Sequence, residues 1–322
     1  MSTKSWIGAS CVIATMLLAF ANIAHSAEKQ IVYIAAKSDL PFWKNIGKGI
    51  KSFATANGYA YLEMDSNLNT QKQLTNAQDA IAKNVAGIVI SPIDSKTASD
   101  VLALAMKAKI PVVIADVGTS GGEYVSTIRS DNYRGAYDVG VALAQAMKEK
   151  GWSTAPFAMV TISLTKKNGQ DRTNGLRDAM KDVGMTKEAP LRQMQDYSAD
   201  ETAKLVKEML IATPALRGLF IETDQPVAGA MQAIKVAKKT GDILLVSFDA
   251  MPEVADLLTS NALVAVGMQQ PYLIGEKSAQ ALISSLSGTP PAKQILVPVL
   301  VGTAKNIVQL MPTVSKTVFG SD

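Results

Sequence analysis

The side chains most often used for nucleophilic catalysis and zinc binding are scarce in this sequence. Its 322 residues contain one cysteine, Cys11, and one histidine, His25. Without residues 1–27, the chain has neither a Ser-His-Asp nor a Cys-His nucleophile, and no thiol for a disulfide or a structural zinc site. The chemistry left to it is that of carboxylates, Lys, Tyr and Arg, an all-oxygen metal site, or binding without catalysis.

Residues 1–27 have the layout of a secretory signal peptide. Lys4 precedes an apolar run over 6–21, and small residues follow as far as Ala27. The alternative is a transmembrane anchor, but this run is shorter than the roughly 20 residues that a spanning helix needs. We expect cleavage within 24–27, most simply after Ala27, and export to the periplasm.

Composition predicts a folded chain of two domains that does not bind nucleic acid. The sequence is 48% apolar, which gives each domain enough residues for a core. Its 32 basic and 28 acidic residues leave a net charge of only +4. Such a small excess does not indicate a surface that follows phosphates.

Short β-rich runs alternate with longer amphipathic segments, as in parallel α/β layers. Strands are predicted over 31–36, 59–65, 87–91 and 111–116, and again over 157–163, 191–195, 217–223 and 243–249. Helices are predicted over 42–56, 70–84, 95–108, 133–149, 168–182, 200–212 and 225–238. The strands lack polar alternation, so helices should cover both sheet faces. The two sets predict two similar doubly wound parallel-sheet lobes with a ligand cleft between them.

Polar and aromatic side chains follow several of these strands. In open parallel sheets, ligands bind beyond the carboxyl ends of the strands. The residues there are 36–43, Ser91 and Asp116 in the first lobe, with 223–224 and 248–249 in the second. Carboxylates bind hydroxyls and aromatic faces cover the C–H surface of a sugar ring. A small sugar or polyol is therefore the predicted ligand.

Six stretches of the sequence, taken in order, resemble the periplasmic sugar-binding proteins of the ribose-binding type, which are type I periplasmic binding proteins. These stretches are 40–59, 64–95, 108–116, 126–132, 246–250 and 268–275. The resemblance runs from about residue 30 to the region of Val301. It implies a monomeric solute receptor of an ABC importer, with a membrane permease as partner, no cofactor, no metal and no enzymatic activity.

The same resemblance implies a three-segment hinge between the lobes. The first lobe is expected to comprise 28–131 and 270–299, and the second 132–269 and 300–322. Residues 302–322 continue past the family's usual end. There, Ile307 to Met311 are expected to add an edge strand, with the last few residues loose.

On the first lobe, the resemblance implies ligand contacts from an aromatic pair and an aspartate. Phe42 and Trp43 match the pair that stacks on the sugar after the first strand. Asp116 matches the sugar-binding aspartate, with a helix cap as its alternative role. On the second lobe and hinge, the implied contacts are Arg172, Tyr197, Phe248, Asp249 and Gln269. Their alternatives are a solvated charge for Arg172, a core position for Tyr197 and hinge hydrogen bonding for Asp249 and Gln269.

Several positions depart from the pattern of ribose binders. Ala36 and Leu40 stand where polar residues are usual, and Val117 replaces an arginine. Ser91 and Thr223, which we retain in the predicted site, each replace an asparagine. A ribose in this cleft would leave hydroxyls unpaired, at about 1–3 kcal/mol each. The predicted ligand is therefore neutral and not ribose: a polyol, a deoxy or smaller sugar, or a furanose-like signal.

Three other functions are alternatives to uptake. A sensor subunit that presents its ligand to a membrane receptor or histidine kinase would have nearly the same sequence. A glycosidase could use Asp116 and Asp249, but a binding role accounts for both carboxylates without raised pKa values. A sugar-responsive DNA-binding repressor would need a helix-turn-helix where this chain has its signal peptide.

Overall fold

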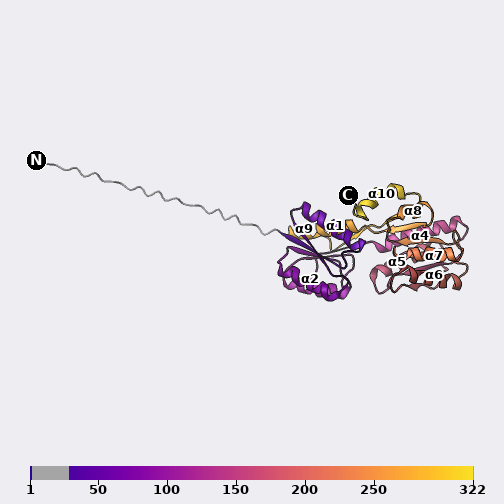
Figure 1. Ribbon diagram of the computed structural model, residues 1–322, viewed down its shortest axis with the longest axis horizontal. Coiled ribbons are helices and arrows are strands. Elements are labelled where there is room, and N and C mark those ends of the chain that lie inside the picture. The colour runs from indigo at the N-terminus through magenta and orange to yellow at the C-terminus, as the bar shows by residue number, and fades with distance from the viewer. Residues whose placement is uncertain (2–28, 322) are drawn as a thin grey trace.

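Residues 30–130 build a parallel sheet that is completed by one strand from much later in the chain. The computed structural model describes Met1 and residues 29–321, and Figure 1 shows its two lobes side by side. The first sheet has the order β11-β5-β4-β3-β1-β2. Its strands are β1 (Gln30–Ala35), β2 (Ala60–Asp65), β3 (Gly87–Ile90), β4 (Val112–Ala115), β5 (Ser126–Ser130) and β11 (Gln294–Val297).

Helices cover both faces of this sheet. The bounds are α1 (Pro41–Ala56) and α9 (Pro271–Leu286) on one face, and α2 (Thr70–Ala82) and α3 (Ser95–Lys107) on the other. Strand β1 shows why its sequence lacks polar alternation: Tyr33 packs into the core beneath α1, and its neighbour Ile34 packs into the core beneath α2.

The second lobe repeats this plan with the order β12-β10-β9-β8-β6-β7. Its strands are β6 (Phe157–Thr161), β7 (Arg192–Gln193), β8 (Gly218–Ile221), β9 (Leu244–Phe248), β10 (Ala265–Met268) and β12 (Leu300–Thr303). Strand β12 is antiparallel to β10, so this sheet is not wholly parallel.

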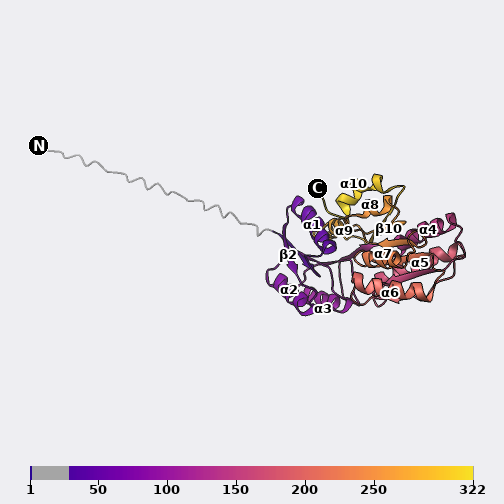
Figure 2. The same cartoon turned by 45° about the vertical axis from the view of Figure 1, so that its right-hand side comes forward.

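The helices of the second lobe also form two layers (Figure 2). One face carries α4 (Asn132–Glu149) and α5 (Lys167–Asp182). The other carries α6 (Ala199–Ala212), α7 (Val227–Val236), α8 (Val254–Thr259) and α10 (Ile307–Thr317). Of the helices in the described residues, none is long and apolar enough to cross a membrane.

Local sequence signals set the helix boundaries as predicted. Gly58 follows α1 with φ +77°, a conformation that suits glycine. Asp94 caps α3 by accepting a hydrogen bond from the backbone N–H of Thr97 at 2.8 Å. The predicted strands and helices are confirmed within a few residues, while β5, β10, β11, β12, α8 and α9 lay outside the predictions.

The expected edge strand at Ile307–Met311 is wrong, because these residues begin helix α10. Ile307, Val314 and Val318 are buried in the core of the second lobe, at a spacing that places them along one side of a helix. A five-residue window is too short to reveal this period. The following residues are not loose either, since the Asn45 side chain donates a hydrogen bond to the Val318 carbonyl at 2.9 Å.

The chain passes between the two sheets three times. It leaves the first lobe after β5, returns between β10 and α9, and crosses again between β11 and β12. These crossings lie next to one another, because β11 and β5 form one edge of the first sheet and β12 and β10 form the corresponding edge of the second. The predicted signal peptide, 1–27, lies outside the described residues apart from Met1.

Candidate ligand-binding site

Two aspartates occupy equivalent places in the two lobes. Asp116 follows β4 and Asp249 follows β9, and these strands hold the same position in their sheets. Both have left-handed backbone conformations, with φ +76° and +66°. Aspartate tolerates this region better than most residues. The fold therefore places one carboxylate from each lobe at the carboxyl ends of the strands.

Arg172 of α5 connects the second lobe's site groups with the crossing after β5. Its Nε donates to Asn132 Oδ1 at 2.8 Å. Its Nη1 donates to the Glu222 carbonyl at 2.7 Å and to Asp249 Oδ2 at 3.1 Å. The guanidinium carbon lies 4.1 Å from the centre of the Phe248 ring. Arg172 is only 2% exposed, so a solvated charge is not its role.

Asp249 is held by three side chains of the second lobe and hinge region. Gln269 Nε2 donates to its Oδ1 at 2.7 Å, while Arg172 and Thr223 Oγ1 contact its Oδ2, each at 3.1 Å. The carboxylate is thus fixed and neutralised before any ligand arrives. Its side chain keeps 20% exposure and can still accept hydrogen bonds.

Asp116 differs from Asp249 in its hydrogen bonding. Among the described residues, its carboxylate has no hydrogen-bond partner. Burial raises its pKa to about 6, Arg172 opposes this shift, and Asp249 adds to it. Groups of the second lobe thus act electrostatically on a carboxylate of the first lobe. Asp116 is therefore an acceptor without a partner in the described part of the chain, and its contact with a ligand stays a prediction.

The aromatic pair lies at the start of α1, directly after β1. Phe42 and Trp43 are half-buried, and their rings meet edge-to-face with centroids 6.1 Å apart. The indole Nε1 of Trp43 is buried without a partner among the described residues. The pair thus combines apolar faces with an unused donor.

Other predicted site residues lie deeper or are already bonded. The Ser91 hydroxyl is fully buried and lies 2.9 Å from the Tyr33 hydroxyl. Phe248 is also fully buried, beneath Arg172. Tyr197 is half-buried, and its hydroxyl accepts a bond from the Ser163 N–H at 3.4 Å. Direct contact of Ser91 or Phe248 with ligand stays a prediction, and in this arrangement both act as supports.

Glu222 is a site residue that sequence reasoning missed. It follows β8, is fully buried, and accepts hydrogen bonds from Thr173 Oγ1 at 2.5 Å and from the Ile162 N–H at 3.0 Å. Burial raises its pKa to about 8, so at neutral pH its side chain is mostly uncharged. The available signal was its place directly after a buried strand. The predicted strand 217–223 included Glu222, so this residue did not stand at a predicted strand end.

Replacing Glu222 by Gln should change how stability depends on pH. The folded protein keeps the Glu222 proton up to about pH 8, whereas an unfolded chain loses it near pH 4.5. This contribution to the free energy of unfolding is present in full below pH 4.5 and is lost as the pH rises to 8. Because Gln has no proton to lose, the melting temperature of Glu222→Gln relative to that of the wild type should rise between pH 5 and 8.

Thermal melts of both proteins across this pH range test that expectation. Glu208→Gln, on the exposed face of α6, is the matched control. A difference between Glu222→Gln and wild type that stays constant from pH 5 to 8 would contradict the protonated state of Glu222.

One ion pair joins the lobes beside this site. Arg129 of β5 lies 3.4 Å from Asp171 of α5, and Lys167 also contacts Asp171. Within residues 29–321, no group of three or more His, Cys, Asp or Glu side chains is arranged to hold a metal ion. Arg129 and Lys167 thus pair with Asp171 and Arg172 pairs with Asp249, while Asp116 has no ion-pair partner among the described residues.

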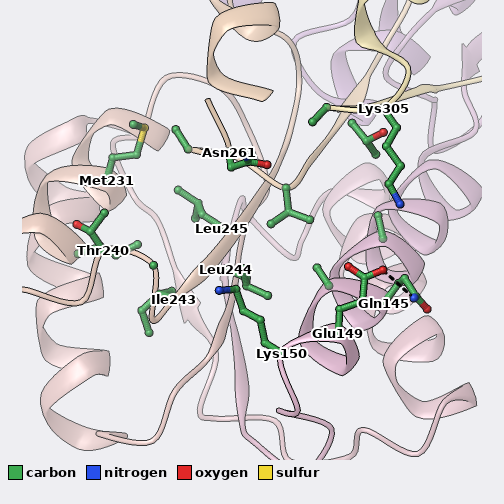
Figure 3. Close-up of a pocket in the computed structure, with 18 of the residues that line it drawn as sticks. Gln145, Glu149, Lys150, Met231, Thr240, Ile243, Leu244, Leu245, Asn261 and Lys305 are labelled. Atoms are coloured by element: carbon green, nitrogen blue, oxygen red, sulfur yellow. Dashed lines mark hydrogen bonds between the residues drawn. The ribbon is translucent and has the colours of Figure 1, made fainter. Parts of the chain in front are cut away.

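A groove of about 1090 Å³ lies elsewhere, at the amino ends of β9 and β10 (Figure 3). Leu244, Leu245 and Ile243 lie between α4, which carries Gln145 and Glu149, and α7, which carries Met231. Parallel sheets bind ligands at the carboxyl ends of their strands, so this groove is not the equivalent of the aspartate cleft.

The fold and cleft define a two-lobed type I periplasmic binding protein. A family model described as a periplasmic binding protein domain matches residues 31–290. The chain therefore belongs to the periplasmic binding protein family. Membership of this family makes it a solute-binding protein and not an enzyme.

Named relatives agree with this assignment. The chain is 27% identical to the ribose import binding protein of Salmonella typhimurium over 280 residues, which cover 87% of this chain and 92% of the relative. It is 26% identical to the D-apiose import binding protein of Paraburkholderia graminis over 299 residues, or 92% and 93% of the two chains. A periplasmic ribose ABC transporter structure from Conexibacter woesei shares the fold, with a TM-score of 0.80, 21% identity and coverage of 89% and 95%.

Proposed function

We propose that this chain is the solute receptor of an ABC importer, and that it binds a small neutral sugar or polyol other than ribose. The observation that carries the proposal is the unpaired Asp116 carboxylate opposite the fixed Arg172–Asp249 pair. The relatives of this chain include ribose and D-apiose import binding proteins, which supports a carbohydrate ligand. A membrane permease is the expected partner, and the receptor is expected to act as a monomer in the periplasm.

Each part of the cleft suits a polyhydroxylated ligand. Asp116 would accept hydrogen bonds from hydroxyls, and charge-assisted bonds of this kind are stronger than neutral ones. Among the described residues, Arg172 Nη2 has no hydrogen-bond partner, so it would donate to a ligand oxygen. The faces of Phe42 and Trp43 would cover the apolar side of a ring.

The bonded states of two side chains support a ligand other than ribose. Where ribose binders place asparagines, this chain has the Ser91 hydroxyl beside Tyr33 and the Thr223 hydroxyl beside Asp249. Neither hydroxyl offers the two-sided bonding of an amide. A ligand with fewer or differently placed hydroxyls would leave fewer of its own groups unpaired.

Closure of the two lobes about the three crossings would convert ligand binding into a change of conformation. We take 28–131 with 270–299 as one lobe and 132–269 with 300–322 as the other. A ligand stabilises the closed state only by contacting both lobes. Asp116 belongs to one lobe and Arg172 to the other, and the bond from Arg172 to Asn132 reaches the first crossing. Ligand contact would therefore act directly on the hinge.

Fluorescence of Trp43 should report binding. The chain has three tryptophans, one of them in the predicted signal peptide, so Trp152→Phe leaves Trp43 as the sole reporter in 28–322. We expect a saturable change with at least one member of a panel of pentoses, hexoses, deoxy sugars and polyols, and calorimetry should confirm it. Ribose should bind more weakly than that ligand. A silent panel would count against carbohydrate capture, and tightest binding to ribose would contradict the ligand class.

A further inference from the structure

Residues 307–321 lie beyond the region that matches the family, and they contact both lobes. Helix α10 belongs to the second lobe, where Ile307 and Val314 are fully buried in the core shared with α8. Both views of the molecule show α10 beside the place where the lobes meet, next to α1 and α8 (Figures 1 and 2).

The residues after α10 bond to the first lobe. Asn45 Nδ2 of α1 donates to the Val318 carbonyl at 2.9 Å, and both residues are buried. Lys48 Nζ donates to the Gly320 carbonyl at 3.1 Å at the surface. Gly320 has φ +59°, and a Cβ added there would lie 3.0 Å from Asn45 Oδ1. The close approach and the backbone conformation both favour glycine at this position.

These contacts reach the element that carries the aromatic pair. Asn45 and Lys48 lie in the first two turns of α1, directly after Phe42 and Trp43. In the rotation about the three covalent crossings that the proposed function requires, α10 moves with one lobe and α1 with the other. Rotation therefore changes the separation of Asn45 and Val318, and the two bonds hold only over part of that motion.

We propose that residues 307–321 form a strap that holds α1 against the second lobe and favours the arrangement in which Asp116 faces Arg172. The strap acts on the same cleft as the proposed function, on which this inference rests. Losing one buried and one exposed hydrogen bond should shift the ratio of lobe arrangements by about tenfold.

Distances between the lobes test the strap without any ligand. Residues 28–322 contain no cysteine, so Gln78→Cys on α2 and Lys207→Cys on α6, both exposed, give two unique sites for spin labels. Pulsed electron paramagnetic resonance then gives the distribution of distances in ligand-free protein. Gly320→Val displaces the strap, and deletion of 319–322 removes its end while keeping the core residue Val318.

The matched control is Gly184→Val, which has a similar left-handed φ of +78° but open space around its Cβ position. We expect both strap variants to gain a second population of interlobe distances, with the control unchanged. Distributions identical to wild type in both strap variants would overturn the proposal, as would an equal change in the control. If either variant unfolds, Lys48→Ala removes the surface bond alone and should give a smaller shift of the same sign, whereas no shift would also overturn the strap.

With a ligand from the panel, both strap variants should bind about tenfold more weakly. Unchanged affinity together with altered ligand-free distances would overturn the strap's link to binding. Failure of every panel ligand would instead count against the proposed function, and the ligand-free distances would still decide whether the strap exists.

Discussion

Arg172→Ala should weaken ligand binding by at least about 30-fold, because about 2 kcal/mol or more of charge-assisted hydrogen bonding is lost. It should also lower the free energy of unfolding by about 3 kcal/mol. The substitution leaves Asp249 without its cation and the Glu222 carbonyl without its 2.7 Å donor. Calorimetry measures the first effect and urea unfolding the second.

Two variants separate the specific role of Arg172 from the effect of losing any arginine of this helix, and its charge from its geometry. Arg177→Ala lies on the same helix but pairs with Glu188 at a half-exposed site, so it should change stability by no more than about 1 kcal/mol and leave affinity intact. Arg172→Lys keeps the charge but loses the planar fork that reaches Asn132 and Asp249 together. Affinity of Arg172→Ala within twofold of wild type would remove Arg172 from the site.

Asp116→Asn should weaken binding by at least about tenfold and at the same time stabilise the ligand-free protein. A carboxylate without a protein partner is the best acceptor in the cleft. Burying its charge also destabilises the folded protein. Its pKa is raised from 3.8 to about 6, so its favourable contribution to folding is complete below pH 3.8 and is lost as the pH rises to 6. Asparagine does not titrate, so Asp116→Asn does not lose stability in this way as the pH rises.

The pH dependence of affinity provides the second readout for Asp116. A ligand that donates hydroxyls to the carboxylate should bind more weakly below about pH 6, where Asp116 takes up a proton. Asp116→Asn should lack this dependence, and Asp100→Asn, on α3 outside the cleft, should retain it. An unchanged affinity for Asp116→Asn, or a wild-type affinity independent of pH between 5 and 7, would contradict the assigned role.

The strand ends of the site could be predicted because they depend on local patterns. The runs before Asp116 and Asp249 are short, apolar and bounded by turn residues, and parallel sheets bring their carboxyl ends together. The family resemblance then selected Arg172 and the aromatic pair from among many candidates.

What could not be predicted depends on contacts between distant residues. Whether an aspartate is satisfied or free depends on the helix that crosses its strand end, and Arg172 lies 77 positions before Asp249. The neutral state of Glu222 likewise arises from burial, which raises its pKa more than the hydrogen bond from Thr173 of another element lowers it. Helix α10 escaped prediction because its apolar residues show their period only over the whole segment from Ile307 to Val318.

The unequal bonding of the two equivalent aspartates gives the cleft a polarity. The ionised Asp116 carboxylate can only accept hydrogen bonds, while the Arg172 guanidinium still has a donor to offer. A ring oxygen, which cannot donate, fits beside Arg172, and a hydroxyl fits beside Asp116. A sugar turned end for end would set acceptor against acceptor. We therefore expect a bound sugar to take a single orientation, with its ring oxygen toward the guanidinium and a hydroxyl toward the unpaired carboxylate.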